Sequence, residues 1–208
     1  MRYRDRTDAG ERLAGAVADL ALEVPVVLAL PRGGLPVAVP VAAALGTRAD
    51  VLVARKVTLP HQPEVALGAV AEGAGDPYLT REGRSLPTEV RARAVDEART
   101  ETGRLAAAYR GDRPLPDVAG RDVVLVDDGL ATGATAAAAL LRLREARPRR
   151  LVLAVPVGPP DAVRALGDLA DDVVCPLVPP DLRAVSLWYD RFDQTTDAEV
   201  TALLSVPG

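Results

Sequence analysis

Two adjacent carboxylates precede a short run of small and hydroxyl-bearing residues, and this stretch carries the clearest chemistry in the sequence. Asp127 and Asp128 follow the apolar run 123–126, and residues 129–135 (GLATGAT) lead into an alanine-rich helical pattern. Free N–H groups at a helix N-terminus favour a phosphate, and threonine hydroxyls add donors. Carboxylates repel phosphate but suit sugar hydroxyls or a hydrated cation. The stretch therefore predicts a site for a phosphorylated ribose.

This stretch also resembles a known family signature. Residues 123–135 are similar to the phosphoribosyl pyrophosphate motif of type I phosphoribosyltransferases, in which four apolar residues precede an acidic pair and a small Thr/Gly loop. Gly129 departs from the aliphatic residue usual there. The resemblance covers nearly all 208 residues and is closest to a bacterial branch of the family. It implies transfer of 5-phosphoribosyl from phosphoribosyl pyrophosphate to a nitrogen nucleophile, with release of pyrophosphate.

The resemblance assigns roles within the motif. Asp127 and Asp128 would hold the ribose hydroxyls and support the ribosyl cation. The 5′-phosphate would be bound by Ala131, Thr132, Gly133, Ala134 and Thr135. Mg²⁺ would be held through phosphoribosyl pyrophosphate and water, with no direct protein ligand expected. The alternative is that the acidic pair only caps a strand and a threonine only caps a helix.

Two neighbours of the acidic pair sharpen these expectations. Alternation along a strand would send Asp127 and Asp128 to opposite sides, so we expect Gly129 to let the backbone turn both toward one ligand. Family members that use 6-oxopurines carry an Asp at the position of Ala131. A hypoxanthine or guanine acceptor is therefore disfavoured, and adenine, a pyrimidine or an unusual amine stays open.

A second loop is a candidate for pyrophosphate binding. Pro31, Arg32, Gly33 and Gly34 follow the apolar run 24–30, and ligands gather at the carboxyl ends of parallel strands. The loop is similar to the family's pyrophosphate loop, in which backbone amides hold the leaving group and a cis non-proline peptide is common. The alternative is a plain turn in which glycine supplies positive φ.

Three further polar residues are assigned to pyrophosphate by the resemblance. Arg55 and Lys56 are predicted to end a strand at the same sheet edge, and Lys56 is counted with the acidic pair as catalytic. Lys56 is the only lysine beside 24 arginines, which suggests a need for a compact, flexible charge. His61 would donate to pyrophosphate from a mobile lid. The alternatives are a solvated Arg–Lys pair and an exposed histidine without a role.

Aromatic residues gather near the C-terminus. Trp188, Tyr189 and Phe192 are three of the six aromatic residues in the chain. They are predicted to stack on a flat base, at about 1 to 3 kcal/mol by analogy with nucleic-acid stacking. The alternative is that they anchor the C-terminal segment to the core.

Composition excludes several other classes. A net charge of −4 and a pI of about 5.1 argue against nucleic-acid binding. One Cys and one His allow neither an internal disulfide nor a Cys₂His₂ zinc site. The charged start and the lack of an apolar run of about 18 residues predict a cytoplasmic protein without a membrane partner. The expected partners are a small-molecule substrate with its acceptor and, as in many family members, a second copy of the chain.

The elements that must position these residues alternate between apolar runs and helical patterns. This predicts an α/β fold with a mainly parallel sheet of about five strands flanked by helices, and a small hood over the active edge. Strands are expected at 24–30, 51–57, 65–72, 78–80, 121–127, 151–157 and 173–175. Helices are expected at 7–22, 36–45, 87–110, 136–147 and 161–169, and after a capping box of Thr196 and Glu199. Pro40 suits its helix only in the first turn.

The sequence shows no clear boundary between domains. The whole chain, 1–208, is expected to be one domain, with a flexible loop at about 57–65 and a C-terminal hood segment at about 176–208. Two rivals to a transferase remain. One is a non-catalytic regulator that binds phosphoribosyl pyrophosphate or a nucleotide, and the other is a hydrolase or phosphorylase of phosphoribosyl compounds.

Overall fold

A parallel sheet forms the centre of the molecule. The computed structural model describes residues 2–59, 61 and 65–205. Within them the sheet has the order β2-β1-β6-β7-β8, and every neighbouring pair is parallel. The strands are β1 (Val26–Ala29), β2 (Ala49–Val51), β6 (Asp122–Val126), β7 (Arg150–Ala154) and β8 (Asp172–Val174). The predicted α/β fold with a mainly parallel five-stranded sheet is confirmed.

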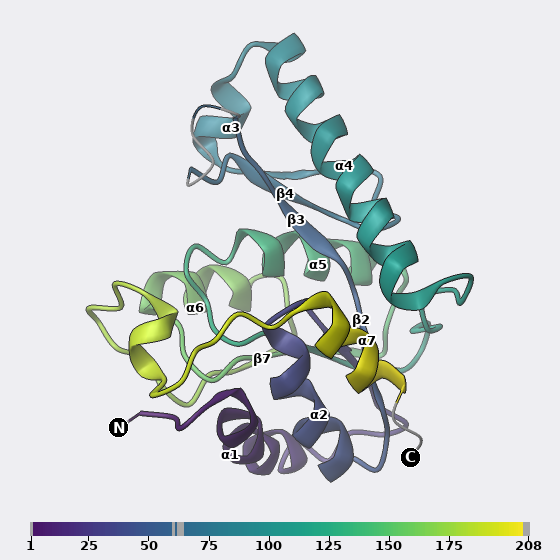
Figure 1. The fold of residues 1–208 in the computed structure, drawn as a ribbon, viewed down its shortest axis with the longest axis vertical. Coiled ribbons are helices and arrows are strands. Elements are labelled where there is room, and N and C mark those ends of the chain that lie inside the picture. Colours follow the sequence, from purple (N-terminus) through teal and green to yellow (C-terminus); the bar gives the residue numbers. More distant parts are fainter. Residues whose placement is uncertain (1, 60, 62–64, 206–208) are drawn as a thin grey trace.

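Side-chain alternation along the central strands builds two cores, one on each face of the sheet. Helices α5 (Ala134–Glu145) and α6 (Pro160–Gly167) pack on one face with Leu28, Leu125 and Leu153. Helices α1 (Arg6–Ala18) and α2 (Gly34–Ala44) pack on the other face with Val27, Val124 and Val152. Figure 1 shows these helix layers on either side of the sheet. All six of these strand side chains are fully buried.

A smaller antiparallel sheet, β3-β4-β5, extends away from the parallel one (Figure 1). Its strands are β3 (Ala54–Val57), β4 (Gly68–Ala71) and β5 (Tyr78–Leu79), followed by α3 (Arg81–Ser85) and the long α4 (Thr88–Arg110). One face packs against α4 through Val57 and Val70, and the other contributes Ala69 and Ala71 to the core under α5. The predicted strands 65–72 and 78–80 are thus shorter and belong to a second sheet.

The prediction of one strand over 51–57 is wrong. The chain leaves the parallel sheet after Val51 and enters the antiparallel sheet at Ala54. The chain changes sheets at Val53. The N–H of Val53 donates to Glu72 Oε1 at 2.8 Å, and its carbonyl accepts from Glu72 N–H at 2.9 Å. Arg55 and Lys56 therefore lie within β3 and do not end a strand of the parallel sheet.

Helix α2 begins earlier than its pattern predicts. It starts at Gly34, so Pro36 occupies the first turn and Pro40 lies inside the helix, contrary to the prediction. Pro40 lacks the N–H that would bond the carbonyl of Pro36. Its ring packs against α1, where a Cβ at Gly10 would lie 3.1 Å from Pro40 Cγ and 2.4 Å from Val37 O. Close packing of α1 on α2 accommodates the internal proline.

The N-terminal segment pairs with the start of the C-terminal segment. Tyr3 N–H donates to Trp188 O at 2.9 Å, next to a bridge between Tyr3 and Tyr189. The C-terminal segment then forms the 3₁₀ turn η1 (Val185–Trp188) and α7 (Asp197–Ser205), which packs on α2 and α4. The predicted capping box is present, since Thr196 N–H donates to Glu199 Oε2 at 2.7 Å. None of the helices in the described ranges combines the length and apolar character needed to cross a bilayer.

Candidate active site

A cavity of about 310 Å³ opens above the carboxyl end of β6. Its walls come from three regions of the chain: the segment after β6, one residue of β3 and two residues of the C-terminal segment. The lining residues are Lys56, Asp127, Asp128, Gly129, Leu130, Ala131, Thr132, Gly133, Thr135, Val185 and Phe192. The acidic pair, part of the predicted phosphate turn and the single lysine therefore share one open cleft.

The backbone after β6 turns both carboxylates into this cavity. Asp127 and Asp128 lie beyond the last strand residue, Val126, so strand alternation no longer separates them. Asp128 N–H donates to Asp127 Oδ1 at 2.9 Å, which closes a local turn. Gly129 has φ +156°, and a Cβ there would lie 2.6 Å from Val185 Cγ1. Val185 thus occupies the space of the aliphatic side chain that the family motif usually carries.

Burial perturbs both carboxyl groups. It raises the pKa of Asp127 well above its ordinary value, and the charge of Asp128 raises this pKa further. Burial also raises the pKa of Asp128, while Arg6 opposes this shift. Two carboxyl groups with perturbed pKa values in a cleft are typical of a functional site, because a stable fold gains nothing from them.

The predicted phosphate turn presents free backbone donors. Gly133 is the N-cap of α5 with φ +74°, a conformation that glycine adopts without strain. Ala134 lies buried beneath the turn, with its N–H 3.5 Å from Thr132 Oγ1. Within the described part of the chain, the N–H groups of Gly133 and Thr135 have no hydrogen-bond partner. These donors, at a helix N-terminus beside an open cavity, favour an anion.

The two glycines of the predicted pyrophosphate loop pack directly under the acidic pair. A Cβ at Gly33 would lie 2.0 Å from Asp128 Oδ2, and one at Gly34 would lie 2.7 Å from Val126 O and 3.0 Å from Asp127 Cα. The peptide between Pro31 and Arg32 is cis, as the resemblance implied. Only residues without a side chain allow this loop to approach the strand end so closely.

Arg32 and Arg55 line a second cavity, of about 150 Å³, beside the same loop. Tyr109 and Asp197 close it, with Tyr109 Oη donating to Asp197 Oδ1 at 2.5 Å and Arg32 Nη1 3.5 Å from the same oxygen. Neighbouring residues of a strand point to opposite faces, so Lys56 lies in the first cavity and Arg55 in the second. The structure therefore divides the predicted pyrophosphate residues between two adjoining cavities.

His61 lies elsewhere. It lines a cavity of about 480 Å³ against α4, with Leu59, Val90 and Arg93, and the structure does not bring it to the acidic pair. Most of the predicted lid around it, residues 60 and 62–64, lies outside the described residues.

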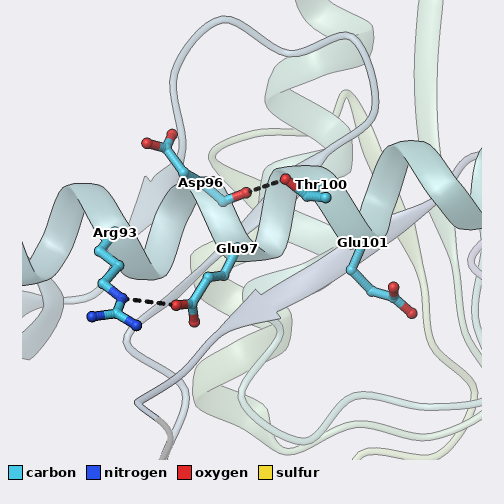
Figure 2. Close-up of a pocket in the computed structure, with 5 residues that line it drawn as sticks. All are labelled: Arg93, Asp96, Glu97, Thr100 and Glu101. Carbon is cyan, nitrogen blue, oxygen red and sulfur yellow. Dashed lines mark hydrogen bonds and ion pairs between the residues drawn. The ribbon is translucent and has the colours of Figure 1, made fainter.

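A wider hollow, of about 610 Å³, runs along α4 and holds none of the predicted site residues. Figure 2 shows its side chains along this single helix, with Arg93 paired to Glu97 at 3.0 Å and Thr100 Oγ1 donating to Asp96 O at 2.9 Å. These side chains do not converge on a common point, so they do not form a binding site.

The three C-terminal aromatic residues occupy different positions. Phe192 lines the 310 Å³ cavity. Tyr189 is buried behind it, between Phe192 and Tyr3, and its hydroxyl donates to Asp128 O at 2.6 Å. Trp188 packs at the edge of the same cluster and does not line the cavity. Phe192 can therefore contact a base, whereas Tyr189 supports the acidic pair from behind.

Comparison with known proteins identifies the family. A model of the phosphoribosyl transferase domain matches residues 5–179. The chain belongs to this family. Two Mycobacterium tuberculosis proteins, named "Putative phosphoribosyl transferase MT0597" and "Putative phosphoribosyl transferase Rv0571c", are 43% identical over 206 residues, which is 97% of this chain and 46% of theirs. The chain thus spans about half the length of these curated relatives.

A solved structure is similar throughout the domain. The crystal structure of TT1426 from Thermus thermophilus is 48% identical, covers 98% of both chains and superposes with a TM-score of 0.83. The cavity over the acidic pair is thus set in a fold that this chain shares over nearly its full length with TT1426.

In this phosphoribosyl transferase domain, Arg6 and Val185 are site residues that the sequence did not predict, and Arg6 makes the closer contact with the acidic pair. Arg6, in the first turn of α1, donates through Nε to Asp128 Oδ2 at 2.8 Å. Its guanidinium carbon lies 3.9 Å from the centroid of the Phe192 ring. One arginine among 24 carries no signal in the sequence, and the contact joins residues 122 positions apart. Only the fold could reveal it.

The domain offers oxygen donors for a hydrated cation at the acidic pair. Across the described residues, no group of three or more His, Cys, Asp and Glu side chains is arranged to enclose a metal ion. In the same part of the chain, Asp127 has no side-chain partner, and its Oδ1 accepts only the Asp128 amide. Carboxylate oxygens beside a phosphate site suit Mg²⁺, which keeps much of its water and shares ligands with bound phosphates.

Proposed function

We propose that the chain transfers 5-phosphoribosyl from Mg²⁺-bound phosphoribosyl pyrophosphate to a nitrogen nucleophile and releases pyrophosphate. The observation that carries this proposal is the shared cavity of about 310 Å³, in which two carboxylates border a turn with free N–H groups. The carboxylates suit the ribose hydroxyls and the turn suits the 5′-phosphate. Family membership supports the same reaction class.

The reaction breaks the bond between ribose C1′ and pyrophosphate oxygen, and the leaving pyrophosphate takes the electron pair. The acceptor nitrogen then bonds to C1′ and passes its proton to the released pyrophosphate or to water. In the intervening oxocarbenium-like state, positive charge develops on the ribose, and Asp127 and Asp128 would stabilise it by proximity. Arg32, Gly33, Gly34 and Arg55 would bind the leaving pyrophosphate beside the acidic pair, and Lys56 would neutralise its charge from inside the cavity.

Mg²⁺ would be held through phosphoribosyl pyrophosphate and water, and Asp127, which has no side-chain partner among the described residues, would accept hydrogen bonds from that water. When bound, Mg²⁺ would neutralise phosphate charge and so favour departure of pyrophosphate. The protein's own contribution is to fix the ribose and the 5′-phosphate at the two ends of the cavity.

The acceptor would lie against Val185 and Phe192, which form the apolar wall of the cavity. The lining holds no carboxylate besides the acidic pair, and Ala131 stands where 6-oxopurine enzymes carry an Asp. This supports an acceptor other than hypoxanthine or guanine, such as adenine, a pyrimidine or an amine. The cytoplasmic location and a homodimer stay predictions.

A turnover assay tests the proposal. The purified protein is mixed with Mg²⁺ and phosphoribosyl pyrophosphate, with and without a panel of bases and amines, and both pyrophosphate and the ribosylated product are measured. Pyrophosphate release that requires an acceptor supports the transferase. Tight binding without turnover on any acceptor would favour the regulator, and formation of ribose 5-phosphate without acceptor would favour the hydrolase.

A further inference from the structure

One guanidinium joins three distant parts of the chain at the site. Arg6 Nε donates to Asp128 Oδ2 at 2.8 Å, and Arg6 Nη1 donates to the backbone carbonyl of Asp193 at 2.6 Å. The face of the same group lies over the Phe192 ring. A carboxylate, a carbonyl and an aromatic ring thus hold Arg6 from three directions, and a planar group held in this way has little freedom to rotate.

The pair formed by Arg6 and Asp128 is shielded from water. The side chains are 12% and 17% exposed, so solvent screens their attraction much less than it would on the surface. A Cβ at Gly33 would lie 3.1 Å from Arg6 Nε as well as against Asp128 Oδ2. The pair is therefore packed on the loop beneath it, which limits the movement of the carboxylate.

Asp128 is fixed from its backbone side as well. Tyr189 Oη donates to Asp128 O at 2.6 Å, from within the aromatic cluster that Phe192 joins. By contrast, Asp127 accepts only an amide of its own turn, within the described residues. The two carboxylates therefore differ: one is held rigidly by other elements, and the other is available to a ligand cation.

We propose that Arg6 is a positioning residue that holds Asp128 in the orientation needed to bind the ribose of Mg²⁺-phosphoribosyl pyrophosphate. Helix α1 is then part of the functional site and does more than cover the sheet. This inference rests on the proposed function, because it assumes the ligand, but it assigns a role to a residue outside the phosphoribosyl pyrophosphate motif.

The charges around Asp128 support this role. The groups that face it are Arg6 from α1, Asp127 from its own turn, Lys56 from β3 and the Tyr189 hydroxyl. Arg6 lowers the pKa of both Asp127 and Asp128, against the effect of burial.

A double-mutant cycle on ligand binding tests the inference. Binding of Mg²⁺-phosphoribosyl pyrophosphate is measured by calorimetry for the wild type, Arg6→Gln, Asp128→Asn and the double variant. We expect Arg6→Gln alone to weaken binding about 10- to 100-fold, the size typical of a hydrogen bond to a charged group. In the Asp128→Asn background the same change should have an effect below about twofold, because Arg6 acts through Asp128.

Several controls separate this role from a general effect on folding. Arg12→Gln removes another arginine of α1, which pairs with Asp8 and lies away from the cavity, and it should leave binding unchanged. Arg6→Lys keeps the charge but cannot hold three partners, so it should restore binding in part. If Arg6→Gln does not fold, the same double-mutant cycle is measured with Arg6→Lys in its place.

The outcomes distinguish the inference from the proposed function. Equal losses from Arg6→Gln in the wild-type and Asp128→Asn backgrounds would overturn the positioning role while the proposed function stands. Unchanged binding in Arg6→Gln would do the same. A wild-type protein that does not bind Mg²⁺-phosphoribosyl pyrophosphate at all would overturn both.

Discussion

The two sides of the cavity are built in different ways. On one side, the acidic pair and the amide turn lie within residues 127–135, between the end of β6 and the start of α5. On the other side, Val185 and Phe192 come from the distant C-terminal segment and reach the cavity only in the fold. A local motif thus provides the groups that would bind ribose phosphate, and long-range packing provides the wall that faces the acceptor.

This difference separates two kinds of function. The turn side needs a specific backbone path and therefore tolerates few residue types, as the close contacts of Gly33 and Gly34 show. The assembled side needs only apolar contact at Val185 and Phe192, so its residues can vary with the acceptor. Substitutions on the turn side should reduce every reaction of the domain, whereas substitutions on the assembled side should change which acceptor is used.

The largest effect is expected from the acidic pair. Replacing both Asp127 and Asp128 by Asn should reduce pyrophosphate release by at least about 10³-fold, because charge stabilisation at the ribose is lost. The fold should persist, since the pair lies beyond β6 and outside the core. Pyrophosphate release and far-UV circular dichroism measure the two parts of this prediction. Turnover retained by this double variant would contradict the role assigned to the acidic pair.

Gly33→Ala should come next. The added Cβ would meet Asp128 Oδ2 at 2.0 Å, so the carboxylate must move, and a displacement of about 1 Å can cost roughly 100-fold in rate. The matched control is Gly15→Ala, an exposed position of α1 where a Cβ meets nothing within 4 Å. It should keep full activity and stabilise the helix by about 0.5 to 1 kcal/mol. Equal activities of the two variants would contradict the packing argument.

Phe192→Ala tests the assembled side. It should raise the KM for the acceptor about 10-fold through lost stacking, and change the KM for phosphoribosyl pyrophosphate by less than about threefold. Leu187→Ala, at a half-exposed position of η1 away from the cavity, should change neither. Steady-state kinetics with each substrate varied in turn would measure this. An equal rise for both substrates would show that the two sides do not act separately.

The smallest effect is on stability, with opposite signs on the two sides. Folding raises the pKa of Asp127, so its ionised form destabilises the folded state at neutral pH, and Asp127→Asn should raise the melting temperature at pH 7. The gain should vanish as the pH falls to about 3.8, where Asp127 is protonated in the folded state and increasingly in the unfolded state too.

Tyr189→Phe should instead lower the free energy of unfolding by about 1 to 2 kcal/mol, because the Asp128 carbonyl loses its buried donor. Melting curves across pH measure both, and a lower melting temperature for Asp127→Asn at pH 7 would refute the first.

Much of the fold and of the turn side could be predicted because their signals are local. The run 123–126 is apolar at every position, as a strand covered on both faces must be, and the small residues after it could only form a tight turn. The division of 51–57 between two sheets could not be predicted. It depends on hydrogen bonds between Val53 and Glu72, residues whose pairing leaves no periodic pattern.

The sequence by itself determined the class of fold, the acidic pair and the amide turn, because strand patterns, helix starts and turns depend on residues a few positions apart. Only the tertiary structure decided that Arg6 holds Asp128, that Val185 fills the space over Gly129 and that Arg55 and Lys56 lie in different cavities. These facts depend on distances between elements that are far apart along the chain. Such distances are set by the packing of the whole core, to which each residue contributes only a small part.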